Sequence, residues 1–293
     1  MDINKHIGKV ILAAAGPGDP DLITIRAVRY LQKADVVLTD RLVSNEILDR
    51  YVNKLAKIIC VGKQYNAEGS ISQSDINVML LQYALEGNLV VRLKGGDVSI
   101  FSNILDELQI LADNNIPYEI IPGVTAALGA AAYAGIPLTA RGYSTSVRFL
   151  TYYKSDIVTD EYWKELANTN DTLVFYMSSS TLDKVVAKLI ENNIAPGKLL
   201  AVVEQTTTPL QNVRVMNLYE YENKFKGERF VSPSLVIIGK VVSLHEKFSW
   251  LASIETKENY FKAVNGNTDA ITKIISEIGK DLFFPFSEAK TGE

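Results

Sequence analysis

Two short segments of this chain combine glycine with a carboxylate in a way that could hold a small polar ligand. Gly16-Pro17-Gly18-Asp19 follows an apolar run over residues 10–15, and Gly95-Gly96-Asp97 follows another over 89–93. Because glycine has no Cβ atom, a ligand can approach the backbone closely there, and the aspartates can accept hydrogen bonds from hydroxyl or ammonium groups. Taken singly, each segment is also consistent with an ordinary tight turn.

Two further segments add charge of both signs. Asp40 and Arg41 stand side by side before Ser44, and Lys63 follows Gly62. Asp40 could equally cap the next helix or pair with Arg41 on the surface, and Lys63 could be an ordinary solvated lysine. The four segments indicate a ligand site only if the strands and helices around them bring them together.

The elements before residue 122 alternate between strand and helix. Apolar runs predict strands over 10–15, 35–39, 57–61, 89–93 and 118–121, and helices are predicted to begin near Asp21, Ser44, Ser74 and Ile104. This alternation predicts a mostly parallel sheet covered on both faces. Ligands bind beyond the carboxyl ends of such strands, so all four segments are expected at one edge of one sheet.

A second set of elements follows Pro122-Gly123. We expect a helix of small residues over 126–134, strands over 146–151, 172–176, 200–204 and 235–238, and a helix over 181–192. The predicted fold class is α/β, with two α/β domains of mostly parallel sheets enclosing a cofactor cleft. Their predicted bounds are 1–121 and 122–252, followed by a tail over 253–293 with an amphipathic helix that begins near Asn267.

Composition excludes several function classes. The 293 residues carry a formal net charge of −4, which argues against a broad nucleic-acid-binding surface. One cysteine and two histidines allow no intrachain disulfide and make a metal site hard to build. Residues 1–9 lack an apolar signal segment, and the apolar stretch over 124–138 is too short to span a bilayer. We therefore expect a cytoplasmic protein without a membrane partner.

The four segments, in this order and at these separations, resemble the tetrapyrrole methyltransferase family from about Gly8 to Trp250. The lines that carry the resemblance are GKVILAAAGPGDPDLITIRAVRYLQKADVVLTDRLVS, VVRLKGGD, IPGVTAALGAAAYAGIPLT, TLVFYM, VVEQTTTPLQ and SPSLVIIGKVVSLHEKFSW. DRLVS, VGK, AAAYAGIPLT and SVRFLT are similar in particular to the branch that methylates uroporphyrinogen III.

The resemblance implies S-adenosylmethionine bound between two α/β domains of a homodimer. It implies C-methylation of uroporphyrinogen III at two pyrrole carbons to give precorrin-2, on the route to siroheme or cobalamin, without a metal. The residues implied for the cofactor are Pro17, Gly95, Gly96, Asp97, Ile100, Thr125, Ala126, Met177 and Thr206. Asp40 corresponds to the proton acceptor and Lys63 to the proton donor, while Arg41, Arg141 and Arg148 are candidate counter-charges for the substrate carboxylates.

The sequence departs from the family pattern at several places, among them the residues after Lys63, where Gln64-Tyr65-Asn66 replaces a more basic run that contains glycine. Residues 98–107 replace Pro-Phe-Ile/Val-Phe-Gly-Arg-Gly-Gly-Glu-Glu, Ala140 and Gly142 replace a histidine and an aspartate, and Tyr152-Tyr153 replaces Gly-His. Two alternatives therefore stay open: another precorrin methyltransferase, or a non-catalytic cofactor-binding relative. A nicotinamide dehydrogenase is disfavoured because the Gly-x-Gly-x-x-Gly fingerprint is absent.

Overall fold

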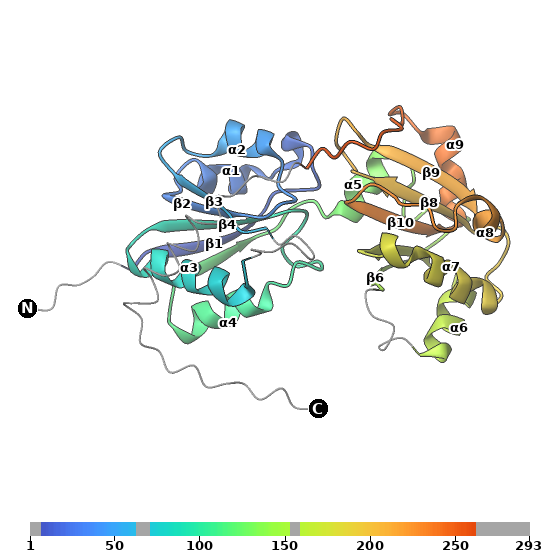
Figure 1. The fold of residues 1–293 in the computed structure, drawn as a ribbon, viewed down its shortest axis with the longest axis horizontal. Coiled ribbons are helices and arrows are strands. Elements are labelled where there is room, and N and C mark those ends of the chain that lie inside the picture. The colour runs from blue at the N-terminus through green and yellow to red at the C-terminus, as the bar shows by residue number, and fades with distance from the viewer. Residues whose placement is uncertain (1–6, 63–70, 153–158, 262–293) are drawn as a thin grey trace, which may run out of the picture.

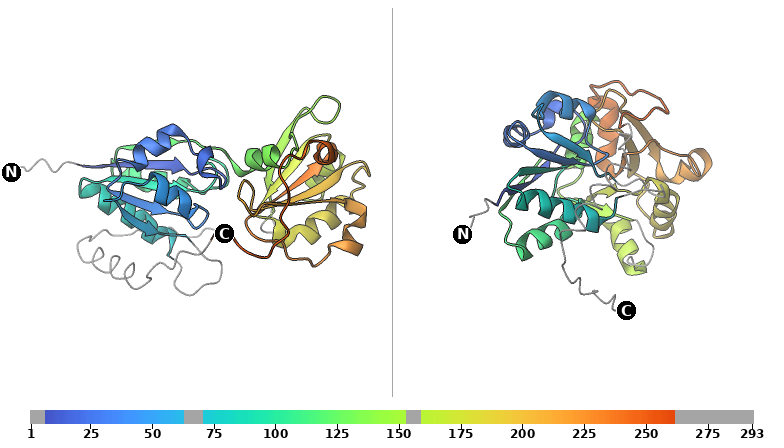
Figure 2. Two further views of the ribbon diagram at one scale, coloured as in Figure 1. Left: turned by 90° about the horizontal axis from the view of Figure 1, so that it is seen from above. Right: turned by 60° about the vertical axis from the view of Figure 1, so that its left-hand side comes forward.

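The computed structural model describes residues 7–62, 71–152 and 159–261. Two five-stranded sheets, one in each half of the chain, form two lobes that lie side by side (Figures 1 and 2). Each sheet has helices on both of its faces, which confirms the α/β fold class.

The first sheet is parallel throughout. Its strands are β1 (Lys9–Ala14), β2 (Val36–Thr39), β3 (Lys57–Cys60), β4 (Leu89–Lys94) and β5 (Tyr118–Ile121), in the order β3-β2-β4-β1-β5. Residues alternate between its faces, so Val10 and Leu12 join one core while Ile11 and Ala13 join the other. This confirms the predicted parallel sheet.

Four helices cover this sheet. α1 (Ile25–Leu31) and α2 (Asn45–Tyr51) lie on one face, and α3 (Gln73–Leu85) and α4 (Leu105–Asp113) lie on the other (Figure 1). Ser44 caps α2 as predicted. The predicted starts at Asp21 and Ser74 are wrong, because the side chains of Thr24 and Ser72 provide the caps instead, Ser72 in a capping box with Asp75.

The second sheet contains β6 (Val147–Thr151), β7 (Thr172–Tyr176), β8 (Leu199–Glu204), β9 (Asn212–Asn217) and β10 (Ser234–Gly239), in the order β6-β7-β10-β8-β9. The expectation of mostly parallel strands does not hold for this sheet, because β6–β7 is parallel and the other three pairings are antiparallel. β9, which the sequence did not predict, follows β8 after a short connection that permits only an antiparallel pairing.

Helices also sandwich the second sheet. α5 (Ala126–Tyr133) and the 3₁₀ helix η5 (Lys240–Leu244) pack on one face, and α6 (Asp160–Asn168) and α7 (Leu182–Glu191) pack on the other. The remaining short helices are η1 (Pro20–Leu22), η3 (Ser179–Thr181), η4 (Leu218–Glu220), α8 (Tyr221–Lys224) and α9 (His245–Phe248). None of the helices over the described ranges is both long and apolar enough to cross a bilayer.

The chain passes between the lobes at two places. Residues 122–125 lead from β5 to α5, and residues 251–261 return from the second lobe towards α2 of the first (Figure 1). The helix expected near Asn267 lies outside the described residues.

Candidate functional site

The glycine-containing segments meet at the carboxyl edge of the first sheet, as the sequence predicts. Gly16 and Gly96 form an antiparallel bridge, in which Gly96 N donates to Gly16 O over 2.7 Å. The loops after β1 and β4 are therefore joined backbone to backbone. This joint requires the left-handed conformations of both glycines, with φ of 81° and 70°.

Asp97 holds this edge together. Its Oδ2 accepts a hydrogen bond from Gly123 N at the end of β5, and its Oδ1 accepts one from Ser99 N, each over 2.8 Å. The carboxylate is largely buried. Asp97 therefore ties the β4 loop to the segment that connects the two lobes, a structural role additional to the cofactor contact that the family resemblance implies.

The glycines of this edge differ in what their missing side chains would meet. A Cβ on Gly95 would lie 2.8 Å from Leu42 Cβ, and one on Gly62 would lie 2.5 Å from Arg41 N, so packing alone excludes larger residues at both. A Cβ on Gly96 would have only Ala126 N nearby, at 3.8 Å. The backbone of Gly96 is thus uncrowded beside the start of α5.

The second lobe contributes a loop after β8 that touches the first lobe directly. Asp19 N donates to Thr207 Oγ1 over 3.0 Å, and a Cβ on Gly18 would lie 3.1 Å from Thr206 O. Pro17 is buried against Gly129 of α5. The predicted cofactor residues Pro17 and Thr206 are therefore neighbours across the two lobes.

Asp19 also makes a second contact across the lobes. Tyr133 OH at the end of α5 donates to Asp19 Oδ2 over 2.6 Å. Burial, together with this hydrogen bond and the charge of Asp19, raises the pKa of Tyr133 to about 12. The neutral phenol is the form that this contact stabilises.

Tyr176, at the end of β7, is a site residue that the sequence analysis missed. Its hydroxyl lies 2.7 Å from Thr125 Oγ1 and accepts a hydrogen bond from Ala127 N over 3.1 Å. Its ring packs on Phe101, with 4.9 Å between the ring centroids. Burial raises the pKa of Tyr176, and the hydrogen bonds to Thr125 and Ala127 oppose that effect. Its place at a strand end, directly before the predicted Met177, was the available signal.

The remaining predicted cofactor residues lie around this tyrosine. Met177 is half-exposed with a φ of 53°, and Ile100 and Ala126 pack against the core shared by α5 and the second sheet. Thr125 is the N-cap residue of α5. The structure thus brings the predicted cofactor residues of both lobes to one region.

Asp40 belongs to a buried charge cluster formed by Asp40, Arg92, Lys94 and Glu107. Arg92 Nη2 lies 2.5 Å from Asp40 Oδ1, and Glu107 accepts hydrogen bonds from Arg92 Nε over 2.8 Å and from Lys94 Nζ over 2.9 Å. Glu107 is fully buried, whereas the Asp40 side chain is 27% exposed. Asp40 is the member of this cluster that solvent, or a ligand, can reach.

Arg92 keeps its charge inside this cluster. Burial alone would lower the pKa of Arg92, but the charges of Asp40 and Glu107 outweigh it and raise the pKa. The sequence analysis missed Arg92 and Lys94, although charged residues inside the apolar run of β4 were a visible signal. Charges that alternate with apolar residues in a central strand need partners, because an unpaired buried charge is very costly.

The predicted substrate-binding and proton-donating residues are less closely gathered. Arg41 is half-buried, with its backbone against Gly62, and Arg141 is exposed in a turn closed by the Ala140–Ser144 bridge. Arg148 lies near the amino end of β6, where hydrogen bonds from its guanidinium to Glu165 and Asp171 raise its pKa. Its charge is matched by these two carboxylates within the second lobe. Lys63 lies outside the described residues.

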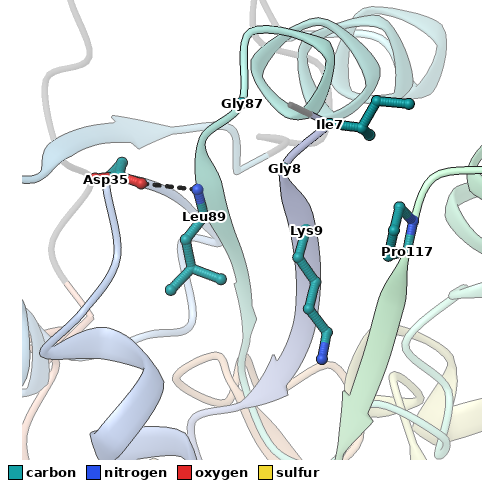
Figure 3. A pocket seen from close by; sticks show the side chains of 7 residues that line it. All are labelled: Ile7, Gly8, Lys9, Asp35, Gly87, Leu89 and Pro117. Atoms are coloured by element: carbon teal, nitrogen blue, oxygen red, sulfur yellow. Dashed lines mark hydrogen bonds between the residues drawn. The ribbon is translucent and has the colours of Figure 1, made fainter. Parts of the chain in front are cut away.

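A shallow depression of about 390 Å³ lies at the amino ends of the strands in the first sheet. Ile7, Gly8, Lys9, Asp35, Gly87, Leu89 and Pro117 line it (Figure 3). Asp35 already accepts a hydrogen bond from Leu89 N over 2.8 Å. This depression is at the opposite end of the sheet from the glycine loops, where a parallel sheet offers no ligand site of the usual kind.

A parallel α/β sheet with glycine loops at its carboxyl edge defines a class of proteins that bind a ligand at that edge. Comparison with known proteins makes this class specific. The sequence model of the protein family of tetrapyrrole (corrin/porphyrin) methylases matches residues 9–222 of this chain. The chain belongs to this family and is a methyltransferase.

The curated relatives and solved structures agree with this assignment. The chain is 44% identical over 248 residues to a siroheme synthase of Vesicomyosocius okutanii and 46% identical over 246 residues to one of Saccharophagus degradans. These matches cover 85% and 84% of the chain but 53% of each relative, so the chain spans about half the length of the curated relatives it matches.

Three solved structures resemble this chain over most of both chains. Uroporphyrin-III-C-methyltransferase from Thermus thermophilus is 33% identical with a TM-score of 0.69, over 84% of this chain and 98% of that one. The same enzyme complexed with S-adenyl homocysteine is 30% identical with a TM-score of 0.66, over 80% and 93%. The cobalt precorrin-4 methyltransferase CbiF is 26% identical with a TM-score of 0.71, over 80% and 95%.

Proposed function

We propose that this chain transfers methyl groups from S-adenosylmethionine to two pyrrole carbons of uroporphyrinogen III, giving precorrin-2. The observation that carries the proposal is the juxtaposition of two features at one sheet edge. A Cβ on Gly96 would meet only Ala126 N of α5, at 3.8 Å, so this backbone is uncrowded, and Asp40 presents a partly exposed carboxylate one strand away. The names of the relatives support the same reaction class.

The residues present fit the cofactor. Gly96 has no Cβ, and the nearest atom that a Cβ would meet is Ala126 N at 3.8 Å, so a ligand group could approach the backbone there. Pro17, Gly95, Ile100, Thr125, Met177 and Thr206 surround the same region from both lobes, and Asp97 fixes the loop. Bound S-adenosylmethionine would supply an electrophilic methyl group. The protein must then align the attacking carbon with that group and exclude competing nucleophiles.

The chain's own chemistry concerns the proton that the methylated ring system must lose. Arg92 holds Asp40 in one orientation and is itself held by Glu107. A carboxylate fixed in this way, with one side still open, can accept a proton from a substrate placed above it. Lys63 is proposed as the proton donor, and Arg41 and Arg141 as counter-charges for the substrate carboxylates.

The test uses uroporphyrinogen III generated anaerobically in place, with purified protein and S-adenosylmethionine. Mass spectrometry should show the gain of two methyl groups by the wild type. Asp40→Asn should lose methyl transfer while still binding S-adenosylhomocysteine, because the amide keeps the shape of the side chain but cannot accept the proton. Gln109→Ala, a change on the outer part of α4, serves as the control and should retain activity.

Two outcomes would contradict the proposal. Cofactor binding without methyl gain would leave a non-catalytic relative, and methyl gain only on later precorrins would assign the chain to another step of the corrin route. An Asp40→Asn variant with full activity would contradict the proposed proton acceptor alone.

Three further expectations belong to this proposal: a homodimer, a cytoplasmic location and a domain boundary near residues 121–124. They come from the family resemblance and from the sequence pattern. Analytical ultracentrifugation of the full chain tests the first, and a monomer over the micromolar range would contradict it.

A further inference from the structure

The segment after Trp250 lies along the second lobe before it crosses to the first. Ile254 N donates to Gln211 O over 3.0 Å, and Ser253 Oγ accepts a hydrogen bond from Val213 N over 3.1 Å. Glu255 lies 3.4 Å from the guanidinium of Arg214. The segment is therefore anchored beside β9 and the loop that precedes it.

Gln205 fastens the next part of this segment. Its Nε2 donates to Glu258 O over 2.9 Å, and its Oε1 accepts a hydrogen bond from Tyr260 N over 2.7 Å. Gln205 is 1% exposed and its φ is 48°. The backbone of Gln205 is left-handed, and both polar atoms of its buried side-chain amide bond to the backbone of the crossing segment. The residue that follows Gln205 is the predicted cofactor residue Thr206.

The far end of the segment reaches the first lobe. Tyr260 OH lies 3.3 Å from Glu46 Oε2 on α2, and the following Phe261 is 4% exposed. Burial raises the pKa of Tyr260, with the charges of Glu46 and Asp19 adding to the effect. The hydroxyl of Tyr260 thus lies at the first turn of α2, whose N-cap residue is Ser44.

We propose that residues 251–261 form a strap that holds the loop of residues 205–208 against the first lobe and so maintains one wall of the cofactor site. Gln205 and Tyr260 are its positioning residues: they act through Thr206 and Thr207 on one side and through α2 on the other. The hydrogen bond from Asp19 N to Thr207 Oγ1 is the contact between the lobes that the strap keeps in register. The matched family region ends at residue 222, so the strap lies beyond it.

This inference rests on the proposed cofactor site, and the experiment separates the two. Tyr260→Phe removes the hydroxyl contact with Glu46, and Tyr260→Ala also removes the ring. Tyr219→Phe is the matched control, because Tyr219 OH donates to Ile194 O over 2.6 Å within the second lobe and has no part in the strap. All variants are made in the full chain and checked for folding by thermal unfolding.

Two readouts are needed. Calorimetric binding of S-adenosylhomocysteine should weaken about three- to tenfold in Tyr260→Ala and less in Tyr260→Phe, the range expected for the loss of one or two intramolecular contacts. Hydrogen exchange at the Asp19 amide, measured without ligand, should quicken in the same order, because this amide bonds across the lobes. Tyr219→Phe should change neither.

The outcomes are distinguishable. Faster exchange at the Asp19 amide in a protein that binds no S-adenosylhomocysteine would support the strap and contradict the proposed function. Unchanged exchange and unchanged affinity in folded Tyr260→Ala would overturn the strap. If Tyr260→Ala does not fold, the same two readouts on Tyr260→Phe decide.

Discussion

At the scale of single residues, the cluster of Asp40, Arg92, Lys94 and Glu107 combines stability with the proposed chemistry. Two cations and two anions balance, and Glu107 is the fully buried member that contacts both cations. Removing one partner of a buried ion pair is far more destabilising than the pair is stabilising, because it leaves a buried charge uncompensated. Within this cluster, loss of the Glu107 charge is therefore expected to lower the stability of the protein most.

Glu107→Gln should lower the free energy of unfolding by about 3 kcal/mol, because Arg92 and Lys94 lose their shared anion. Urea denaturation followed by circular dichroism measures this change. Glu165→Gln is the matched control, since Glu165 pairs with Arg148 at the surface and the loss should be at most about 1 kcal/mol. Equal losses in the two variants would contradict the importance assigned to burial.

The contact between Tyr133 and Asp19 predicts a pH dependence at alkaline pH. An unfolded tyrosine titrates near pH 10, and the folded pKa of Tyr133 is about 12, so the folded state binds this proton more tightly. The stability from this contact is complete below pH 10 and is lost as the pH rises towards 12. Tyr133→Phe should therefore lose less stability than the wild type between these pH values.

Chemical denaturation at pH 9 and pH 11.5 would measure that difference. Asp19→Asn offers a second check, because removing the acceptor's charge should lower the phenol pKa seen by ultraviolet titration. A wild type and a Tyr133→Phe variant with parallel stability profiles would rule out the contact as a source of pH dependence.

At the scale of elements, the glycine loops predict a graded response to added methyl groups. Gly96→Ala should fold but cost about 1 kcal/mol, because a φ of 70° disfavours a Cβ, and the methyl should occupy space proposed for the cofactor. Gly95→Ala should be more destabilising, since its methyl would lie 2.8 Å from Leu42 Cβ. Thermal unfolding and S-adenosylhomocysteine binding, measured together, separate the two effects.

Gly197→Ala is the control for these loops, because its Cβ would meet nothing within 4 Å. This variant should have little effect on the stability and no effect on the binding of S-adenosylhomocysteine. Gly96→Ala with unaltered binding would argue against a cofactor beside this glycine.

The first sheet could be read from the sequence because its local signals agree with one another. β1 is an apolar run that ends shortly before Gly16, and β4 is a mostly apolar run that ends directly before Gly95. The second sheet was harder, because β9 alternates polar and apolar residues and has no such signal. Its antiparallel pairings depend on contacts that are distant in the sequence, which periodicity does not report.

The site could be predicted to a similar extent. Positions at strand ends, such as Gly96 and Met177, follow from the motif and the edge of the sheet. The partners of Asp40 could not be predicted, because Arg92 and Glu107 approach it only after β2, β4 and α4 have packed. Tyr176 was missed for a related reason, since its role comes from hydrogen bonds to Thr125 and Ala127 in another part of the chain.

At the scale of the whole molecule, each lobe has its own hydrophobic cores. Leu189, fully buried between α7 and the second sheet, belongs to a core that contains only residues after Thr151. Leu189→Ala should cost about 2–5 kcal/mol in the second lobe. Hydrogen exchange should then quicken in β7 and β8, while the amides of β1 and β4 keep most of their protection.

Lys184→Ala, an exposed change on the same helix, should leave both sheets unaffected. Equal loss of protection in the two sheets after Leu189→Ala would mean that the lobes unfold as one unit, and it would argue against the proposed domain boundary.

The two crossings of the chain between the lobes limit how these bodies can move. A body tied to another at a single point keeps three rotations, whereas a body tied at two separate points keeps one, about the line that joins them. Residues 122–125 supply the first tie, and the contact of Tyr260 with Glu46 supplies the second. In addition to these two ties, Asp19 bonds both Thr207 and Tyr133 of the second lobe. A rotation that separates the edges carrying Gly96 and Thr206 must therefore first break the contact of Asp19 with Thr207.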